Sequence, residues 1–253
     1  MRPLGNCHSL KSVARALFPY NKDWWFIIDR DHHDDAAVEK SWRDFPDPNQ
    51  HNLLIWRRKE LENYLLEPAW LTVSRYIGWG YDEATLKRMI CQAADERVWF
   101  EAANLVLRAL REEVKGAPSD LLRRGALTVD DEAHALDAMR ASTMLHTLKN
   151  AAGVDLSDQA LAERLSAEVH RLSGGALPLR WGVGRWRDLM PGKELIHELL
   201  PAFVVKDTTG RRLQGPLALN VLARDLFKNH PNGAPADLLT LRATLGKILP
   251  SPP

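Results

Sequence analysis

A run near the start of the chain, Trp24–Asp29, which is apolar up to its final Asp, constrains the fold more than any other feature. It is aromatic and β-branched with no alternating polar residues, which is typical of a strand buried on both faces. A second short run, Leu53–Trp56, predicts another buried strand, and a helix is expected before the first strand, from Ser9 to about Phe18. This order of helix, strand, loop and strand predicts an α/β fold with a parallel sheet.

The first predicted strand ends in two acids separated by one residue, Asp29 and Asp31. Side chains at positions i and i+2 of an extended chain point the same way, and the carboxyl ends of strands are where α/β sheets bind ligands. Two neighbouring carboxylates repel each other unless a cation lies between them, and hard oxygen ligands suit Mg²⁺ or Mn²⁺. The alternative is that the first Asp caps a helix or forms a turn.

A second acidic segment, Arg57–Pro68, follows the second predicted strand and contains Glu60 and Glu62. If the segment is extended, these two glutamates share a face; if it is already helical, only one can aim at a site. The alternative is a solvated helix N-terminus with acids placed to suit the helix dipole.

A third segment, Leu179–Ile196, combines bases, aromatic residues and glycines. Its glycines lack the spacing of a dinucleotide fingerprint or a Walker A loop. Lys193 lies in the first turn of a predicted helix. The helix dipole favours an anion at that end, so the lysine is not placed there to suit the dipole. It fits a helix start that binds a phosphate. The neighbouring bases Arg180, Arg185 and Arg187 are candidate contacts to a nucleic-acid backbone. The alternative is an exposed basic loop.

The middle of the chain is predicted to be helical because apolar residues recur at helical spacing; one helix is expected from a cap near Ser157 through Leu161 and Leu165. We expect an α/β core formed by residues 1–68 and 173–253, with a helical insertion at 69–172. His134, His146 and His170 show no metal-ligand spacing there and are expected at the surface or the edge of the core.

Composition bounds the class of protein. The chain has 253 residues, 45% hydrophobic and 26% charged, as in an ordinary soluble globular protein. A net charge of +1 means that a nucleic-acid partner must be met by a local basic patch. Two cysteines are too few for a disulfide framework, and no run is long enough for a signal peptide or a membrane span. These features predict a cytoplasmic protein without a membrane partner.

The order of these motifs resembles one family. An apolar strand ending in Asp29-Arg30-Asp31 is followed by Glu-Leu-Glu-Asn-Tyr-Leu-Leu at 60–66, a helical stretch, and Pro-Gly-Lys-Glu-Leu at 191–195. This arrangement is similar to the TOPRIM nuclease domains of the OLD (overcoming lysogenisation defect) type and to their relatives that act with ATPases in bacterial anti-phage systems. The resemblance covers residues 5–249 and implies a TOPRIM-like, mostly parallel sheet flanked by helices.

The resemblance also implies an activity. The family's metal ligands match Asp29, Asp31, Glu60 and Glu62. The basic residue that neutralises the scissile phosphate matches Lys193. The implied chemistry is hydrolysis of DNA or RNA with two Mg²⁺ or Mn²⁺ ions. The implied partners are nucleic acid and an ATPase, and a homodimer stays open.

One departure from the family leaves alternatives open. TOPRIM domains begin with a strand and a Glu-Gly turn whose glutamate is a metal ligand and general base, whereas no acid precedes Asp23 here. The expectations are that the real start lies upstream, that another chain supplies the glutamate, or that the protein is a catalytically impaired binding or effector subunit. An Asp-x-Asp phosphatase ranks lower, because His33 stands where that family has Thr or Val and Asp207 lacks the acidic companion it needs.

Overall fold

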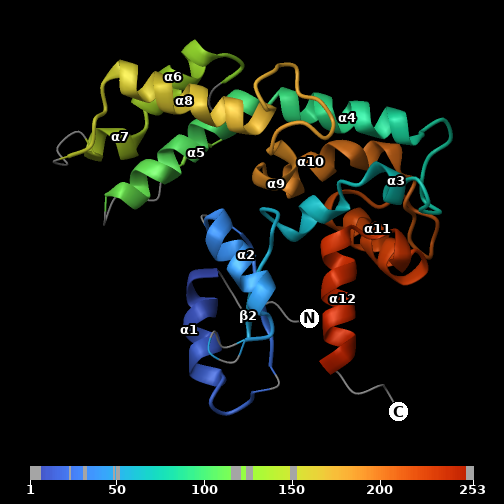
Figure 1. The fold of residues 1–253 in the computed structure, drawn as a ribbon. Helices are drawn as coiled ribbons and strands as arrows, with labels where there is room; N and C mark the ends of the chain where they lie inside the picture. Colours follow the sequence, from blue (N-terminus) through green and yellow to red (C-terminus); the bar gives the residue numbers. More distant parts are fainter. Residues whose placement is uncertain are drawn as a thin grey trace. The chain divides into compact units, whose positions relative to one another are not determined.

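A computed structural model describes residues 7–22, 24–30, 33–47, 49, 52–114, 121–123, 128–148 and 153–248. The chain divides into two compact units (Figure 1). We call Met1–Ala84 with Pro191–Pro253 the sheet unit, and Thr85–Met190 the helical unit. From the sequence we expected the helical insertion to span residues 69–172. In the structure, residues 69–84 belong to the sheet unit, and residues 173–190 belong to the helical unit.

The sheet unit contains two parallel strands, β1 (Phe26–Ile28) and β2 (Leu53–Ile55), paired in the register Phe26 to Leu53 and Ile28 to Ile55. Within the described ranges this is the one sheet. The predicted α/β class is confirmed, with a small parallel sheet. Each strand is shorter than the apolar run that predicted it.

Helices cover both faces of this sheet (Figure 1). Phe26 and Ile28 pack with α1 (Cys7–Leu17) and α2 (Asp35–Asp44). Leu54, which points to the opposite face, packs with α12 (Ala236–Ile248). Because alternate residues of a strand face opposite ways, a strand with helices on both sides needs apolar residues at every position.

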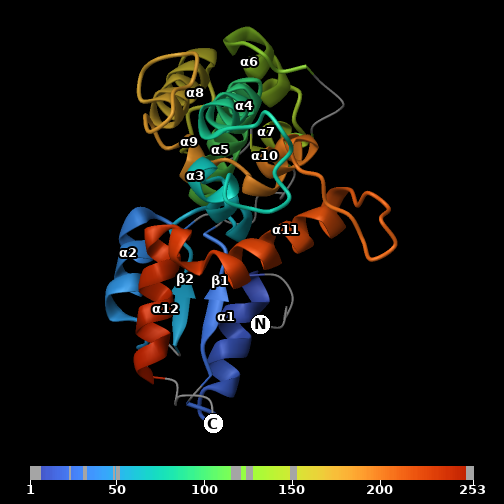
Figure 2. The ribbon, with the colours of Figure 1, turned by 90° about the vertical axis from the view of Figure 1, so that its right-hand side faces the viewer.

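The remaining elements of the sheet unit are short helices around the strand ends and one longer helix (Figure 2). They are η2 (Leu61–Leu65), α3 (Pro68–Leu71), α10 (Gly192–Leu199), η3 (Leu200–Ala202), α11 (Gly215–Asn229) and η4 (Pro231–Gly233). A short antiparallel bridge joins Ile77 to Phe203, and a second joins Lys206 to Arg212.

The helical unit is built from α4 (Glu83–Asp95, whose first two residues belong to the sheet unit), α5 (Val98–Glu113), α6 (Glu132–Arg140), α7 (Thr143–Leu148), α8 (Asp158–Ser173) and α9 (Trp186–Leu189). The predicted cap at Ser157 is confirmed, since its hydroxyl accepts the Ala160 N–H at 3.2 Å. The buried stripe of α8, which includes Leu161 and Leu165, follows the predicted helical period. No helix in the described part of the chain has the length and apolar character to cross a bilayer.

A buried carboxylate anchors α11 to the turn that follows α3. Asp225 is 4% exposed and accepts hydrogen bonds from the Ser74 hydroxyl at 2.7 Å, the Arg75 N–H at 3.2 Å and the Asn229 amide at 2.8 Å. Burial acts to raise the pKa of Asp225, but the hydrogen bonds and the Arg75 charge outweigh it, so the net shift of the pKa is downward. The ionised form therefore stabilises the fold.

Replacing this carboxylate should destabilise the protein in a pH-dependent way. We expect Asp225→Asn to lower the free energy of unfolding at pH 7 by about 1–3 kcal/mol, as for the loss of hydrogen bonds to a charged group. A depressed folded-state pKa gives stability that is present above the unfolded pKa, about 3.9, and is lost as pH falls through the folded value. The stabilities of the two proteins, measured by urea titration, should therefore begin to converge as pH falls below about 4 and meet below the folded-state pKa. A difference that is constant from pH 7 to pH 3 would contradict this account.

Candidate active site at the strand ends

The segments that follow β1 and β2 run side by side. The Trp56 N–H donates to the Ile28 carbonyl at 3.0 Å, and the Arg30 N–H donates to the Lys59 carbonyl at 3.1 Å. The Arg30 guanidinium also donates to the Arg57 carbonyl at 2.8 Å. These bonds place Asp29, which directly follows β1, and the segment that ends at Glu60, five residues after β2, at the same edge of the sheet. Asp29 is exposed, and Asp31 lies outside the described residues.

Glu60 and Glu62 do not lie on one extended segment. Glu60 is extended (φ −138°, ψ 163°) and precedes the 3₁₀ helix η2, which contains Glu62. Glu60 and Asn63 form a capping box, in which each side chain accepts the other residue's backbone N–H; the bond from the Glu60 N–H to Asn63 Oδ1 is 3.0 Å. Of the two conformations considered for this segment, the structure shows the helical one, in which Glu62 lies in η2 and Glu60 is its N-cap.

The start of α10 docks on this capping box. The Gly192 N–H donates to Asn63 Oδ1 at 3.1 Å, and the Lys193 N–H donates to Glu60 Oε2 at 3.0 Å. Two predicted motifs separated by 129 residues therefore meet in one place. The backbone amides expected to bind a phosphate are instead capped by the protein's own side chains, while the Lys193 side chain is exposed.

Glycine is required at position 192 because α10 approaches Asn63 so closely. A Cβ atom there would lie 2.3 Å from the Asn63 backbone nitrogen and 2.5 Å from its Oδ1. Asn63 itself is completely buried. Both residues belong to the predicted motifs, but neither was assigned this role from the sequence; the signal for it is the Asn three residues after an acidic cap.

The residues at this edge suit Mg²⁺ or Mn²⁺ in chemical type. Asp29, Glu60 and Glu62 supply carboxylate oxygens, which hard divalent cations prefer. The N–H donors that hold the Glu60 carboxylate leave it further lone pairs, and ligating carboxylates are commonly oriented in this way. In the described ranges, these three acids do not form a group with three ligand atoms within 4.8 Å of one another.

The buried Tyr64 and the partly buried Trp42 hold the segment after β2 in place. The Tyr64 hydroxyl accepts the Arg57 N–H at 3.2 Å and the Arg58 N–H at 3.4 Å. Burial raises the pKa of Tyr64, so its phenol stays protonated. The Arg57 guanidinium lies 4.4 Å from the Trp42 ring centroid and donates to Asp237 of α12 at 2.7 Å. This segment is therefore fixed to both α2 and α12.

The predicted nucleic-acid contacts Arg180, Arg185 and Arg187 belong to the helical unit, whereas Lys193 belongs to the sheet unit. Arg180 is exposed, and Arg187 stacks on Trp181 at 4.5 Å from the ring centroid. Gly184 has a structural role, since a Cβ there would lie 2.0 Å from the Leu172 carbonyl oxygen.

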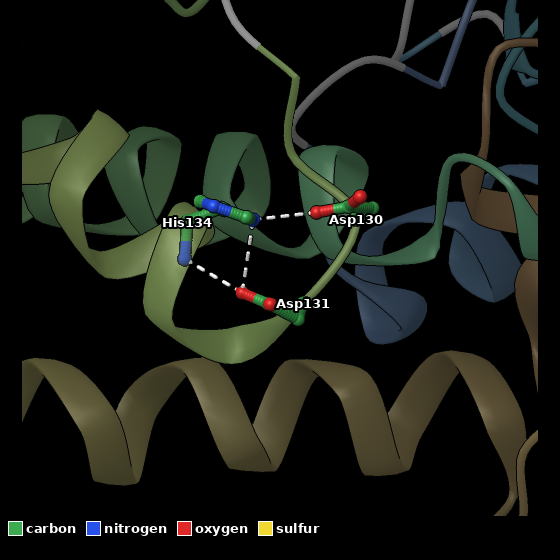
Figure 3. Close-up of side chains that lie close together, drawn as sticks. All are labelled: Asp130, Asp131 and His134. Atoms are coloured by element: carbon green, nitrogen blue, oxygen red, sulfur yellow. Dashed lines mark hydrogen bonds and ion pairs between the residues drawn. The ribbon is translucent and has the colours of Figure 1, made fainter.

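Asp130, Asp131 and His134 form the one group in the described residues that places three ligand atoms within 4.8 Å (Figure 3). Asp131 caps α6 by accepting the His134 N–H at 2.8 Å, and the ring Nδ1 lies 2.5 Å from Asp130. The hydrogen bond to Asp130 raises the pKa of His134 and favours the imidazolium, which donates hydrogen bonds and does not ligate metals. A helix cap and an ion pair account for this exposed group.

No protein-family model, curated protein or solved structure matches this chain.

The close approach at Gly192 gives a direct test of how α10 is held. Gly192→Ala should lower the free energy of unfolding by about 1–3 kcal/mol, the usual cost of overpacking a tight contact. Gly246→Ala is a matched control in α12, where a Cβ meets nothing within 4 Å. That change should be neutral or stabilising by about 0.5–1 kcal/mol, because Ala favours a helix over Gly. Urea unfolding of the two variants measures both, and equal stabilities would rule out the close contact.

Proposed function

We propose that this protein is a metal-dependent nuclease of the TOPRIM type, similar to OLD nucleases, that hydrolyses phosphodiester bonds of DNA or RNA. One observation supports this proposal above the others. The Glu60–Asn63 capping box and the Gly192–Lys193 helix start meet at the edge where β1 and β2 end. The family resemblance requires these motifs to form one site, although nothing in their local sequence brings them together.

The proposed roles follow from the chemistry of each side chain. Asp29 and Glu60, completed by Asp31 and Glu62, would hold two Mg²⁺ or Mn²⁺ ions. Bound metal would supply a water of lowered pKa and would stabilise the leaving oxygen. The Lys193 amide orients the Glu60 carboxylate, and the exposed Lys193 side chain would neutralise the charge that develops at phosphorus.

The proposed partners extend this role. Arg180, Arg185 and Arg187 would contact the nucleic-acid backbone, and the cation–π contact with Trp181 holds the Arg187 guanidinium on the ring. By resemblance, an ATPase subunit would act with the protein in anti-phage defence in the cytoplasm.

A second candidate is a binding or effector subunit that keeps the fold without turnover. The bond between Glu60 and the Lys193 N–H favours this candidate, because a carboxylate that caps a helix has a sufficient structural role. The phosphatase alternative gains no support from a particular contact.

Removal of the two acids after β1 tests the proposal. We expect purified protein with Mg²⁺ or Mn²⁺ to cleave plasmid DNA or tRNA, and EDTA to stop the reaction. Asp29→Asn with Asp31→Asn should lower the cleavage rate by roughly 100-fold or more, because both are metal ligands in the proposal. Asp130→Asn with Asp131→Asn is the matched control, since it removes the same charge and Asn preserves the α6 cap.

Each result separates the candidates. Loss of cleavage in the first double variant alone supports the nuclease. Equal loss in both variants would contradict the assigned site. A wild-type protein that binds nucleic acid but cleaves neither substrate, with metal and a candidate ATPase present, would favour the second candidate.

A further inference from the structure

The C-terminal segment, residues 201–253, separates its charges in space. It contains three acids and seven bases, all seven exposed. Asp225 is buried against Ser74, Asp237 pairs with Arg57 at 2.7 Å, and Asp207 accepts the Thr209 and Arg211 N–H groups of its own turn. The acids are thus bound to internal partners while the bases face solvent. The seven bases are Lys206, Arg211, Arg212, Arg224, Lys228, Arg242 and Lys247.

Five of these bases lie on two connected elements. Lys206 and Arg212 face each other across an antiparallel bridge, and Arg211 lies in the turn between them. The hairpin leads into α11 (Figure 2). On that helix Leu217, Arg224 and Lys228 follow at spacings of seven and four, so they share one side. No exposed acid lies on α11, whose acid is the buried Asp225.

Two exposed apolar side chains lie on these elements or on a segment hydrogen-bonded to them. Trp79 is 100% exposed and Leu217 is 63% exposed. The Gly78 N–H donates to the Ala202 carbonyl at 2.8 Å, and the Arg212 guanidinium donates to the Phe203 carbonyl at 3.2 Å. Trp79 and Arg212 are therefore both attached to the same short segment.

We propose that this surface binds single-stranded nucleic acid; we call it the C-terminal cationic surface and define it by Trp79, Lys206, Arg211, Arg212, Leu217, Arg224 and Lys228. Its bases complement a phosphate backbone, and an exposed Trp beside them provides a face on which an unpaired base stacks. In a chain of net charge +1, the excess of exposed bases within residues 201–253 supplies the local basic patch that a polyanion requires.

This surface would bind the substrate of the proposed nuclease, and it lies outside the sequence motifs. Its assignment to nucleic acid rests on the proposed function. An acidic protein segment is the competing occupant. Trp79 argues for nucleic acid, because a base has a planar face that stacks on an indole ring.

Binding measured without metal tests the inference independently of cleavage. Fluorescein-labelled single-stranded DNA and RNA of one sequence would be titrated with protein in EDTA at several KCl concentrations, with anisotropy as the readout. Arg211→Gln with Arg224→Gln should make the slope of log K against log salt shallower by about 1.4, since each contact to a single strand contributes about 0.7. Arg111→Gln with Arg123→Gln is the control, because it removes two exposed bases from the helical unit.

Trp79→Ala should weaken binding about tenfold through lost stacking, and Trp79→Phe should retain most of the affinity. Because Trp79 is fully exposed, neither change should alter the fold. The relative affinities of DNA and RNA identify the preferred polymer.

Three results would overturn the inference: no binding by wild type, an equal slope in the surface variant and the control, or tighter binding of polyglutamate than of either oligonucleotide. The last would assign the surface to an acidic protein. Cleavage with Mg²⁺ is scored separately. If the protein binds nucleic acid through this surface but cleaves nothing, only the proposed nuclease activity is overturned. If it cleaves nucleic acid while the surface variants bind like wild type, only the proposed binding surface is overturned.

Discussion

The buried amide of Asn63 is the interaction on which the candidate site depends. Its Oδ1 accepts the N–H groups of Glu60 and Gly192 and so joins the segment after β2 to the start of α10. Loss of this acceptor would leave two donors without a partner in a region where Asn63 is fully buried, at a cost of about 1–3 kcal/mol for each buried group. Glycine at 192 lets the two backbones approach closely enough for one side chain to serve both.

This contact and the parallel pairing of β1 and β2 together position the side chains of the candidate site. The strands bring the segment carrying Asp29 beside the segment carrying Glu60, and the capping box then fixes the Glu60 carboxylate against the Lys193 amide. An acid from each strand end and an exposed lysine thereby belong to one edge of the sheet unit. The same contact gives Glu60 a structural role, so capping and metal binding would use different lone pairs of one carboxylate.

Local patterns predicted the parts of the fold that local physics determines. The apolar runs around Phe26 and Leu54 gave the strands, and Ser157 gave the start of α8. The conformation of Glu62 stayed open, because a 3₁₀ helix and an extended segment both suit its sequence. Three features were not predicted. The Asn63–Gly192 contact and the Asp225 anchor join residues far apart in the chain. The excess of exposed bases on α11 depends on the burial of its one acid. His134 acquired its two carboxylate neighbours through the capped turn of α6, a pairing that its spacing to other histidines did not indicate.

In the proposed function, the acids at the carboxyl ends of β1 and β2 hold a divalent metal. Crystals grown with Mn²⁺ and measured at the manganese absorption edge test it directly, because the anomalous signal locates the ion without reference to activity. We predict a manganese peak within coordinating distance, about 2.0–2.3 Å, of the carboxylates of Asp29 and Glu60. A peak only beside Asp130, Asp131 and His134, or no peak at the strand ends at saturating Mn²⁺, would contradict the assignment.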